Sequence, residues 1–192
     1  MATSLKHCLS GLALGLCLAI GTPVTTMAQE LGHLRLVDRL DRPVDGYCLD
    51  ILGVGETLRV DVPIFAHNCK PGLTPDSAVM MTSEGMIRFP AVDLCVTAAG
   101  VNGRALPGAA IILRSCDGRA AFFEASALQH FDFRDDGRLA LRGTNLCLAV
   151  GTVSDTTYST RDRWRVLSVE DCAATPLFLS QWEFNTGPFP SP

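Results

Sequence analysis

Lysine is nearly absent from this chain of 192 residues, which contains only Lys6 and Lys70. Acidic residues outnumber basic ones by 20 to 16, so the formal net charge is −4. Such a chain has no basic stripe that could bind the phosphates of nucleic acid or the head groups of anionic lipid. We therefore expect no nucleic-acid partner.

Catalytic motifs are also missing from the sequence. It has no G-x-S-x-G, no H-E-x-x-H, no P-loop and no C-x-x-C. The histidines after residue 28 are His33, His67 and His130, and none has a motif around it. Aspartates are plentiful, but spacing alone does not select the pair of carboxylates that a glycosidase uses. We predict that the protein is not an enzyme and needs no cofactor.

The longest apolar run is short and lies near the N-terminus. Residues 9–20 follow Lys6 and His7 and precede a polar region that ends at Ala28. This is the pattern of an export signal, so we expect residues 1–28 to be one, with cleavage before Gln29.

Lipidation at Cys17 is an alternative interpretation of this segment. Leu16, the residue before it, is larger than a lipidation signal normally allows. No later segment approaches 18 uninterrupted apolar residues, so we expect no stable membrane insertion. These features together predict a secreted or periplasmic protein.

Six cysteines follow the predicted export signal, and an even number in an exported chain indicates disulfides. Separations of 21, 21 and 25 residues favour pairing of neighbours. The predicted pairs are Cys48–Cys69, Cys95–Cys116 and Cys147–Cys172. Each bridge would contribute roughly 3 kcal/mol by closing a loop of the unfolded chain. A zinc site is the rival interpretation, but no two cysteines have the close spacing of metal knuckles, so we expect no metal.

The three segments bracketed by cysteines are copies of one unit. Runs of alternating apolar and polar residues begin at Gly32, Gly85 and Gly137, which lie 53 and 52 residues apart. Each run is typical of a strand with one buried face after a tight turn. A period near 50, without room for a helix in each copy, predicts a threefold all-β arrangement.

Each copy is predicted to contain four strands. In the second copy we place them at about 86–90, 94–98, 110–115 and 129–133, and we expect no more than one short turn over 118–127. The third copy is four residues longer between its cysteines, and we assign the extra length to a polar loop over 155–160.

These repeats resemble the ricin B-type β-trefoil lectin family over residues 32–187. Its hallmarks are three repeats, a C-x-D opening, a closing L-x-x-C strand and a Q-x-W core motif in each repeat. The openings in this chain are Cys48-Leu49-Asp50, Cys95-Val96-Thr97 and Cys147-Leu148-Ala149. The Q-x-W positions hold Ser77-Ala78-Val79, Gln129-His130-Phe131 and Ser180-Gln181-Trp182, so this motif is degraded.

The resemblance implies a single β-trefoil of about twelve strands in three repeats, each with a disulfide of its own. We assign it to residues 29–187, with a proline-rich tail over 188–192. Phe131 and Trp182 are expected in the core, because they lie on the inward phase of their strands. Asp135 and Asp136 are expected in a solvated turn.

The resemblance also implies a way of binding sugar within one repeat. In the family, the aspartate of C-x-D accepts hydrogen bonds from sugar hydroxyls, and an aromatic side chain two residues before the second cysteine stacks on the sugar ring. An asparagine just before Q-x-W completes the pocket. In the first repeat these positions hold Asp50, His67 and Asp76. The function implied is non-catalytic glycan binding there.

The other two repeats depart from the pattern of the family. The second has Thr97 and Arg114 at the first two positions, and the third has Ala149 and Glu170. Their sugar sites are therefore expected to be lost.

Structural roles for the three candidate residues stay open at this point. Asp50 could accept backbone hydrogen bonds in the turn toward Gly53, and His67 could simply lie at a strand end. Asp76 follows a proline and could be only a turn residue.

A second class of function also stays open, namely a trefoil that binds a protein partner and has lost its sugar sites. Toxin-delivery subunits with ricin-like folds are a precedent that the resemblance suggests. The contact would be the loop over 155–163, which ends at Trp164, since aromatic and arginine side chains anchor interfaces. Packing of Trp164 at the core or its rim is the alternative role for that side chain.

Overall fold

A computed structural model of the protein describes residues 30–120 and 123–187. The predicted export signal (1–28) and proline-rich tail (188–192) lie outside the described residues. In the described part of the chain, no helix is long and apolar enough to cross a membrane. The regular structure there is all strand apart from three short 3-10 turns, which are η1 (Gly55–Thr57), η2 (Ser126–Leu128) and η3 (Leu177–Leu179).

Twelve strands form one sheet, and they fall into three successive sets of four. The first set is β1 (Leu31–Leu36), β2 (Tyr47–Asp50), β3 (Phe65–Asn68) and β4 (Val79–Met81). The second set is β5 (Ile87–Phe89), β6 (Leu94–Ala98), β7 (Ala109–Arg114) and β10 (Phe131–Phe133). The third set is β11 (Leu139–Leu141), β12 (Leu146–Thr156), β13 (Arg163–Asp171) and β14 (Trp182–Asn185).

The segment over 118–127 contains more structure than the single turn predicted from the sequence. A two-stranded hairpin of β8 (Arg119–Ala120) and β9 (Phe123–Glu124) precedes η2. Two-residue strands carry too little hydrophobic pattern to be recognised from sequence.

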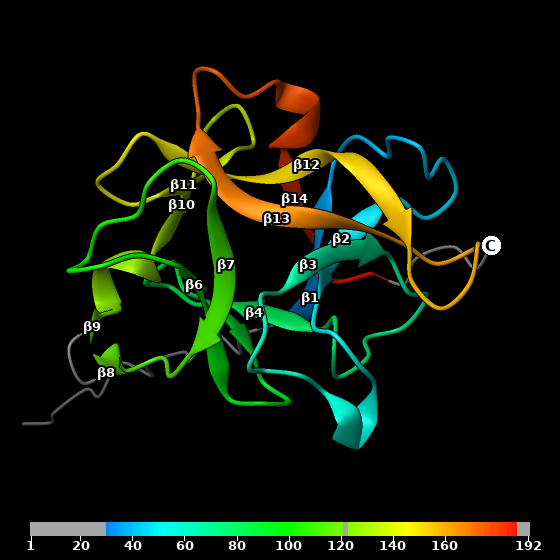
Figure 1. The fold of residues 1–192 in the computed structure, drawn as a ribbon, viewed down its shortest axis with the longest axis horizontal. Coiled ribbons are helices and arrows are strands. Elements are labelled where there is room, and N and C mark those ends of the chain that lie inside the picture. The colour runs from blue at the N-terminus through cyan, green and yellow to red at the C-terminus, as the bar shows by residue number, and fades with distance from the viewer. Residues whose placement is uncertain (1–29, 121–122, 188–192) are drawn as a thin grey trace, which may run out of the picture.

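The three sets follow the same pairing rule. The second strand of each set pairs with the first and the third strand of that set. The fourth strand leads into the next set through β4–β5 and β10–β11, and β14 returns to pair with β1. Strand β13 also pairs with β3 and β7, and it crosses the molecule between them (Figure 1). The sheet therefore closes on itself.

The register shows that the sets are equivalent residue by residue. The first cysteine of each set lies opposite the residue two positions before the second cysteine. Cys48 faces His67, Cys95 faces Arg114 and Cys147 faces Glu170. These partners are the positions that the sequence comparison aligned, so the first, second and third sites can be compared directly.

One apolar core fills the interior, and all three sets contribute to it. Phe131 and Trp182 are buried in it, as the sequence predicts. The indole of Trp182 donates a hydrogen bond of 2.9 Å from Nε1 to the Leu148 carbonyl oxygen, which satisfies the one polar atom of a buried tryptophan. Val79 occupies the corresponding place in the first set and is fully buried.

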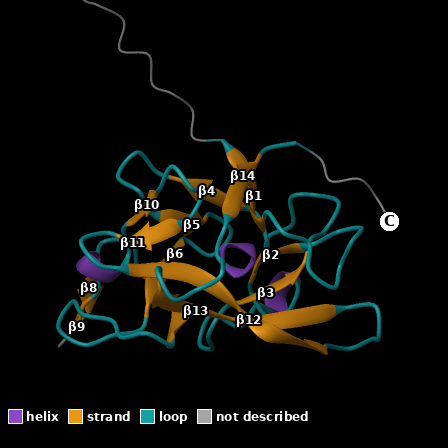
Figure 2. Cartoon of the chain, turned by 90° about the horizontal axis from the view of Figure 1, so that it is seen from above, coloured by secondary structure: helices purple, strands orange, loops and turns teal. Residues whose placement is uncertain are grey.

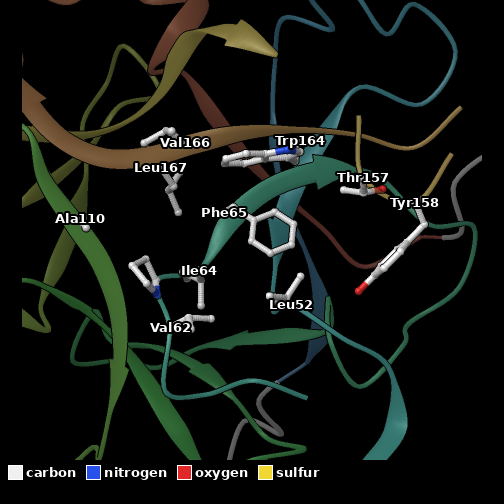
Figure 3. A pocket seen from close by; sticks show the side chains of 11 residues that line it. Leu52, Val62, Ile64, Phe65, Ala110, Thr157, Tyr158, Trp164, Val166 and Leu167 are labelled. Carbon is white, nitrogen blue, oxygen red and sulfur yellow. The ribbon is translucent and has the colours of Figure 1, made fainter. Parts of the chain in front are cut away.

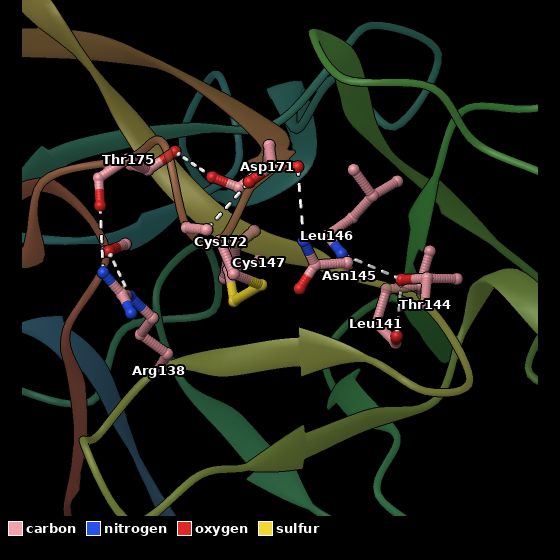
Figure 4. The surroundings of a disulfide bond; sticks show 12 residues. Arg138, Leu141, Thr144, Asn145, Leu146, Cys147, Asp171, Cys172 and Thr175 are labelled. Carbon is pink, nitrogen blue, oxygen red and sulfur yellow. Dashed lines mark hydrogen bonds between the residues drawn. A yellow bond between two sulfur atoms is a disulfide. The ribbon is translucent and has the colours of Figure 1, made fainter.

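The six cysteines form the disulfides Cys48–Cys69, Cys95–Cys116 and Cys147–Cys172, which are the pairs that the spacing favours. Each disulfide joins a cysteine on the second strand of a set to a cysteine that lies one or two residues after the end of the third strand. Figure 4 shows the surroundings of the last of them, where Asp171 lies beside Cys172. The Asp171 carboxylate accepts hydrogen bonds from the backbone N–H groups of Ala173 and Ala174. The chain is thus anchored covalently and by hydrogen bonds where it leaves the sheet.

The extra length of the third set extends a hairpin as well as a loop. Strand β12 continues to Thr156, with Asp155 opposite Trp164 and Thr156 opposite Arg163. The predicted polar loop over 155–160 is therefore wrong in its first two residues, and residues 157–162 connect the strands. Polar side chains are compatible with a strand here, because the hairpin extends past the core at one edge of the molecule (Figure 2) and its side chains are mostly exposed.

Asp41 fastens this hairpin to the first set. Its carboxylate accepts hydrogen bonds from the Tyr47 hydroxyl and the Ser154 hydroxyl, at 2.8 and 2.6 Å. It also pairs with the guanidinium groups of Arg163 and Arg165. Burial opposes ionisation of Asp41, but the hydrogen bonds outweigh it and lower the pKa of the carboxyl below its usual range. Asp41 is therefore ionised throughout the physiological range.

We predict that Asp41→Asn lowers the free energy of unfolding by about 2 kcal/mol, because the buried guanidinium of Arg165 loses its anionic partner. Asp41 is itself 37% exposed, so solvent screening keeps the cost below that of a fully buried pair. Urea denaturation at pH 7 measures the change. Asp61→Asn is the matched control, since Asp61 pairs with Arg59 on the open surface, and it should leave stability unchanged. Equal stability of the two variants would contradict the role given to Asp41.

Candidate functional site

Two buried aspartates and one lysine meet at the end of β2. Asp50 is the last residue of this strand, and the backbone N–H of Ile51 donates a 2.9 Å hydrogen bond to the Asp76 carbonyl oxygen. That bond holds the turn over 74–77 beside Asp50. Lys70 Nζ donates to Asp50 Oδ2 at 2.7 Å and also to Asp76 Oδ2. The ammonium therefore lies between the two carboxylates.

This arrangement shows which contacts the three candidate residues make within the protein. The Asp50 carboxylate bonds to a side chain rather than serving only the turn toward Gly53. Asp76 does belong to a turn, in which Ala78 N–H donates to the Thr74 carbonyl oxygen, but its carboxylate also binds Lys70. His67 lies within β3, where its ring Nδ1 is 3.9 Å from Asp50 Oδ2.

The charges in this cluster do not balance, because one ammonium faces two carboxylates. Burial raises the pKa of Asp50 from its usual value near 3.8 to about 7, although Lys70 favours the ionised form. Burial acts to lower the pKa of Lys70, but the carboxylates of Asp50 and Asp76 raise it further, so the net shift is upward. Burial and the charge of Lys70 lower the pKa of His67. At neutral pH the cluster therefore holds a charged ammonium and a neutral imidazole.

A pocket of about 340 Å³ opens beside the cluster. Asp50, His67 and Lys70 line it, together with Phe65 and the turn that follows β2. Asp76 is not among the lining residues and reaches the pocket through its bond to Lys70. The remaining wall comes from the loop between β12 and β13, which supplies Thr157, Tyr158 and Asp162. The site therefore draws on the third repeat as well as the first.

The sequence interpretation named Asp50 and His67, which line this pocket, but it named neither Lys70 nor the wall from the third repeat. One signal for Lys70 was present, because it is the only lysine after the predicted export signal and directly follows Cys69. No local pattern links Tyr158 to Asp50, since the two residues are more than a hundred positions apart. Only the pairing of β13 with β3 brings them together.

At the position of Asp50, the other two repeats have Thr97 and Ala149 and therefore no carboxylate. Thr97 is fully buried, and its hydroxyl oxygen accepts a 3.0 Å hydrogen bond from Gln129 Nε2. Ala149 is also buried, and Glu170 accepts a hydrogen bond from the Ser168 hydroxyl. Among the residues that the structure describes, no cluster of side chains could hold a metal ion.

No family model matches the chain, and no curated protein does. Solved structures do match. The agglutinin from Abrus precatorius is 18% identical, with a TM-score of 0.57, over 83% of this chain and 49% of that chain. The β-trefoil lectin of the Vibrio vulnificus hemolysin/cytolysin, with N-acetyl-D-lactosamine bound, is 14% identical, with a TM-score of 0.50, over 83% and 96% of the two chains.

This chain has the β-trefoil fold. A non-toxic homologue of type II RIPs from Momordica charantia, in complex with α-methyl-D-galactoside, is 15% identical with a TM-score of 0.53, over 82% of this chain and 48% of that chain. The designed threefold symmetric protein ThreeFoil is 14% identical with a TM-score of 0.55, over 81% and 97%. The trefoil chain spans about half the length of the two plant proteins.

The raised pKa of Asp50 predicts a specific pH dependence of stability. The folded state holds the Asp50 proton more tightly than the unfolded state, so this contribution is complete below pH 4 and is lost as the pH rises through 7. Asp50→Asn removes the titration. Relative to this variant, the wild-type free energy of unfolding should fall by about 4 kcal/mol between pH 4 and pH 8.

Urea denaturation at several pH values, followed by tryptophan fluorescence, measures this difference. Asp132→Asn is the matched control, because Asp132 is exposed on β10 and pairs with Arg142 at the surface. It should keep the wild-type pH dependence over this window. A parallel pH dependence of wild type and Asp50→Asn would contradict the titration of Asp50 in the folded state.

Proposed function

We propose that this protein binds a glycan without catalysis and that one sugar residue occupies the pocket of the first repeat. The observation that carries the proposal is the cluster of Asp50 and Lys70 at the polar pocket, because the other two repeats have Thr97 and Ala149 in place of Asp50. The sugar-bound trefoils among the similar structures support the same class of ligand. The three disulfides support an exported protein, secreted or periplasmic, because such bonds persist in oxidising compartments.

The pocket offers the groups that a sugar needs. The Asp50 carboxylate accepts hydrogen bonds from sugar hydroxyls, and the Lys70 ammonium donates to a hydroxyl or ring oxygen. The neutral His67 ring and the neighbouring Phe65 ring, whose centroids are 6.0 Å apart, provide apolar surface for the C–H side of the sugar. Asp76 takes part indirectly, since it holds the Lys70 ammonium beside Asp50.

A protein partner bound near Trp164 is the second candidate function. Its support is the exposure of Tyr158, at 91%, and of Val166, at 54%, on either side of Trp164. The position of the loop over 157–162 favours glycan binding over this second role. It is bonded to the first repeat, where Arg42 Nη1 donates to the Arg161 carbonyl oxygen at 2.8 Å, and it lines the polar pocket.

A glycan array followed by calorimetric titration of the best glycan tests the first proposal. We predict that Asp50→Ala and His67→Ala each weaken binding about 10-fold to 100-fold, through loss of a charge-assisted hydrogen bond and of a ring wall. Circular dichroism would verify that both variants fold.

The threefold repeat provides a matched control for His67→Ala. Glu170 occupies the same position in the third repeat, so Glu170→Ala should leave glycan binding unchanged. If no glycan binds, or if the first-repeat variants bind as well as wild type, the proposal is wrong. In that case, pull-down from the exported compartment with wild type and with a form shortened within 157–162 would test the protein partner.

A further inference from the structure

A second cavity, of about 550 Å³, lies beside the polar pocket and is almost entirely apolar. Its walls include Leu52, Ile64, Phe65, Trp164 and Val166, with Tyr158 on the loop at one side (Figure 3). The volume lies within the range of about 300–1,000 Å³ that is typical of ligand pockets. Apolar surface left open in this way is costly in water, so the cavity is a candidate binding site.

The cavity forms where the third strands of all three repeats meet. Val166 of β13 lies opposite Phe65 of β3, and Ser168 of β13 lies opposite Ala110 of β7. The backbone N–H of Ile64, just before β3, donates a 2.9 Å hydrogen bond to the carbonyl oxygen of Ile111 on β7. Strands β3, β7 and β13 are thus joined to one another in pairs. The cavity therefore differs from a sugar site built within one repeat.

The apolar cavity and the polar pocket share a wall. Leu52, Phe65, Thr157 and Tyr158 line both. A row of rings leads from one to the other, since the Phe65 centroid is 6.0 Å from that of His67 and 6.1 Å from that of Trp164, both edge to face. A single ligand can therefore contact Asp50 and Lys70 at one end and the apolar cavity at the other.

The shared wall is held in place by the first repeat. Arg163 N–H donates a 3.0 Å hydrogen bond to Asn68 Oδ1, and Thr157 N–H donates to the Asp162 carbonyl oxygen within the loop. These bonds fix the loop that supplies Thr157 and Tyr158 to the lining of both cavities.

We propose that the apolar cavity binds an alkyl group attached to the sugar in the polar pocket, so that the ligand is an amphiphilic glycoconjugate. This inference rests on the proposed glycan binding at Asp50. The polar end then satisfies the buried charges of Asp50 and Lys70, while the alkyl chain covers Val166 and the rings of Phe65 and Trp164.

Paired glycosides test this inference by titration below the micelle concentration. The probes are methyl and octyl β-D-galactopyranoside and methyl and octyl β-D-glucopyranoside. For the sugar that binds, the octyl glycoside should bind about 10-fold to 100-fold more tightly than the methyl glycoside, because a few buried methylene groups supply that factor. Val166→Asp should abolish the higher affinity for the octyl glycoside and leave the affinity for the methyl glycoside unchanged.

Val153→Asp is the matched control, because Val153 is a valine on β12 that is 77% exposed and does not line the cavity. Val153→Asp should retain the higher affinity for the octyl glycoside. Tyr158→Ser is a second variant of an exposed residue, and it should reduce this higher affinity even if Val166→Asp folds poorly.

The failure of this inference and the failure of the proposed function give different results. Equal affinity for methyl and octyl glycosides overturns the alkyl site while glycan binding stands. Octyl binding that is lost in Val166→Asp but unchanged in Asp50→Asn overturns the coupling of the two cavities. If none of the methyl and octyl probes binds and the glycan array is also negative, the proposed function fails and this inference fails with it.

Discussion

Strand β13 hydrogen bonds to strands of all three repeats. It pairs with β12 in its own repeat, with β3 in the first and with β7 in the second. A β-strand has only two edges, so it serves three partners by engaging different stretches of its length. Residues 163–171 thereby close the sheet around one core and place the second half of the β12–β13 hairpin against the first repeat. The apolar cavity and the wall of the polar pocket both depend on this placement.

Threefold equivalence in the backbone has allowed the repeats to diverge in their side chains. The third repeat has Ala149 where the first has Asp50, yet its longer hairpin supplies Tyr158 and Asp162 to the pocket of the first repeat. The second repeat replaces the same carboxylate with Thr97, which is satisfied by a buried hydrogen bond from Gln129. The pocket beside Asp50 and Lys70 is therefore lined by the first repeat and by the longer hairpin of the third.

Lys70 makes it possible to bury two carboxylates at the end of β2. Burial would strongly disfavour the ionisation of two unpaired carboxylates, and a single ammonium offsets most of that free-energy cost. Burial nevertheless raises the pKa of Asp50 to about 7, and the nearby charge of Asp76 adds to this effect. The same ammonium fixes the direction of both carboxylates, and the Asp50 carboxylate lines the polar pocket.

The sequence by itself determined the all-β class, the threefold repeat and the cysteine pairs, because strand alternation, glycine turns and cysteine spacing are local or periodic signals. It also indicated Asp50 and His67, which lie at repeat-equivalent positions near the cysteines. Only the tertiary structure decided the role of Lys70, the extension of β12 to Thr156 and the meeting of Tyr158 with Asp50. Those features depend on ion pairing and on strand contacts between residues far apart in the chain, and no local pattern encodes such contacts.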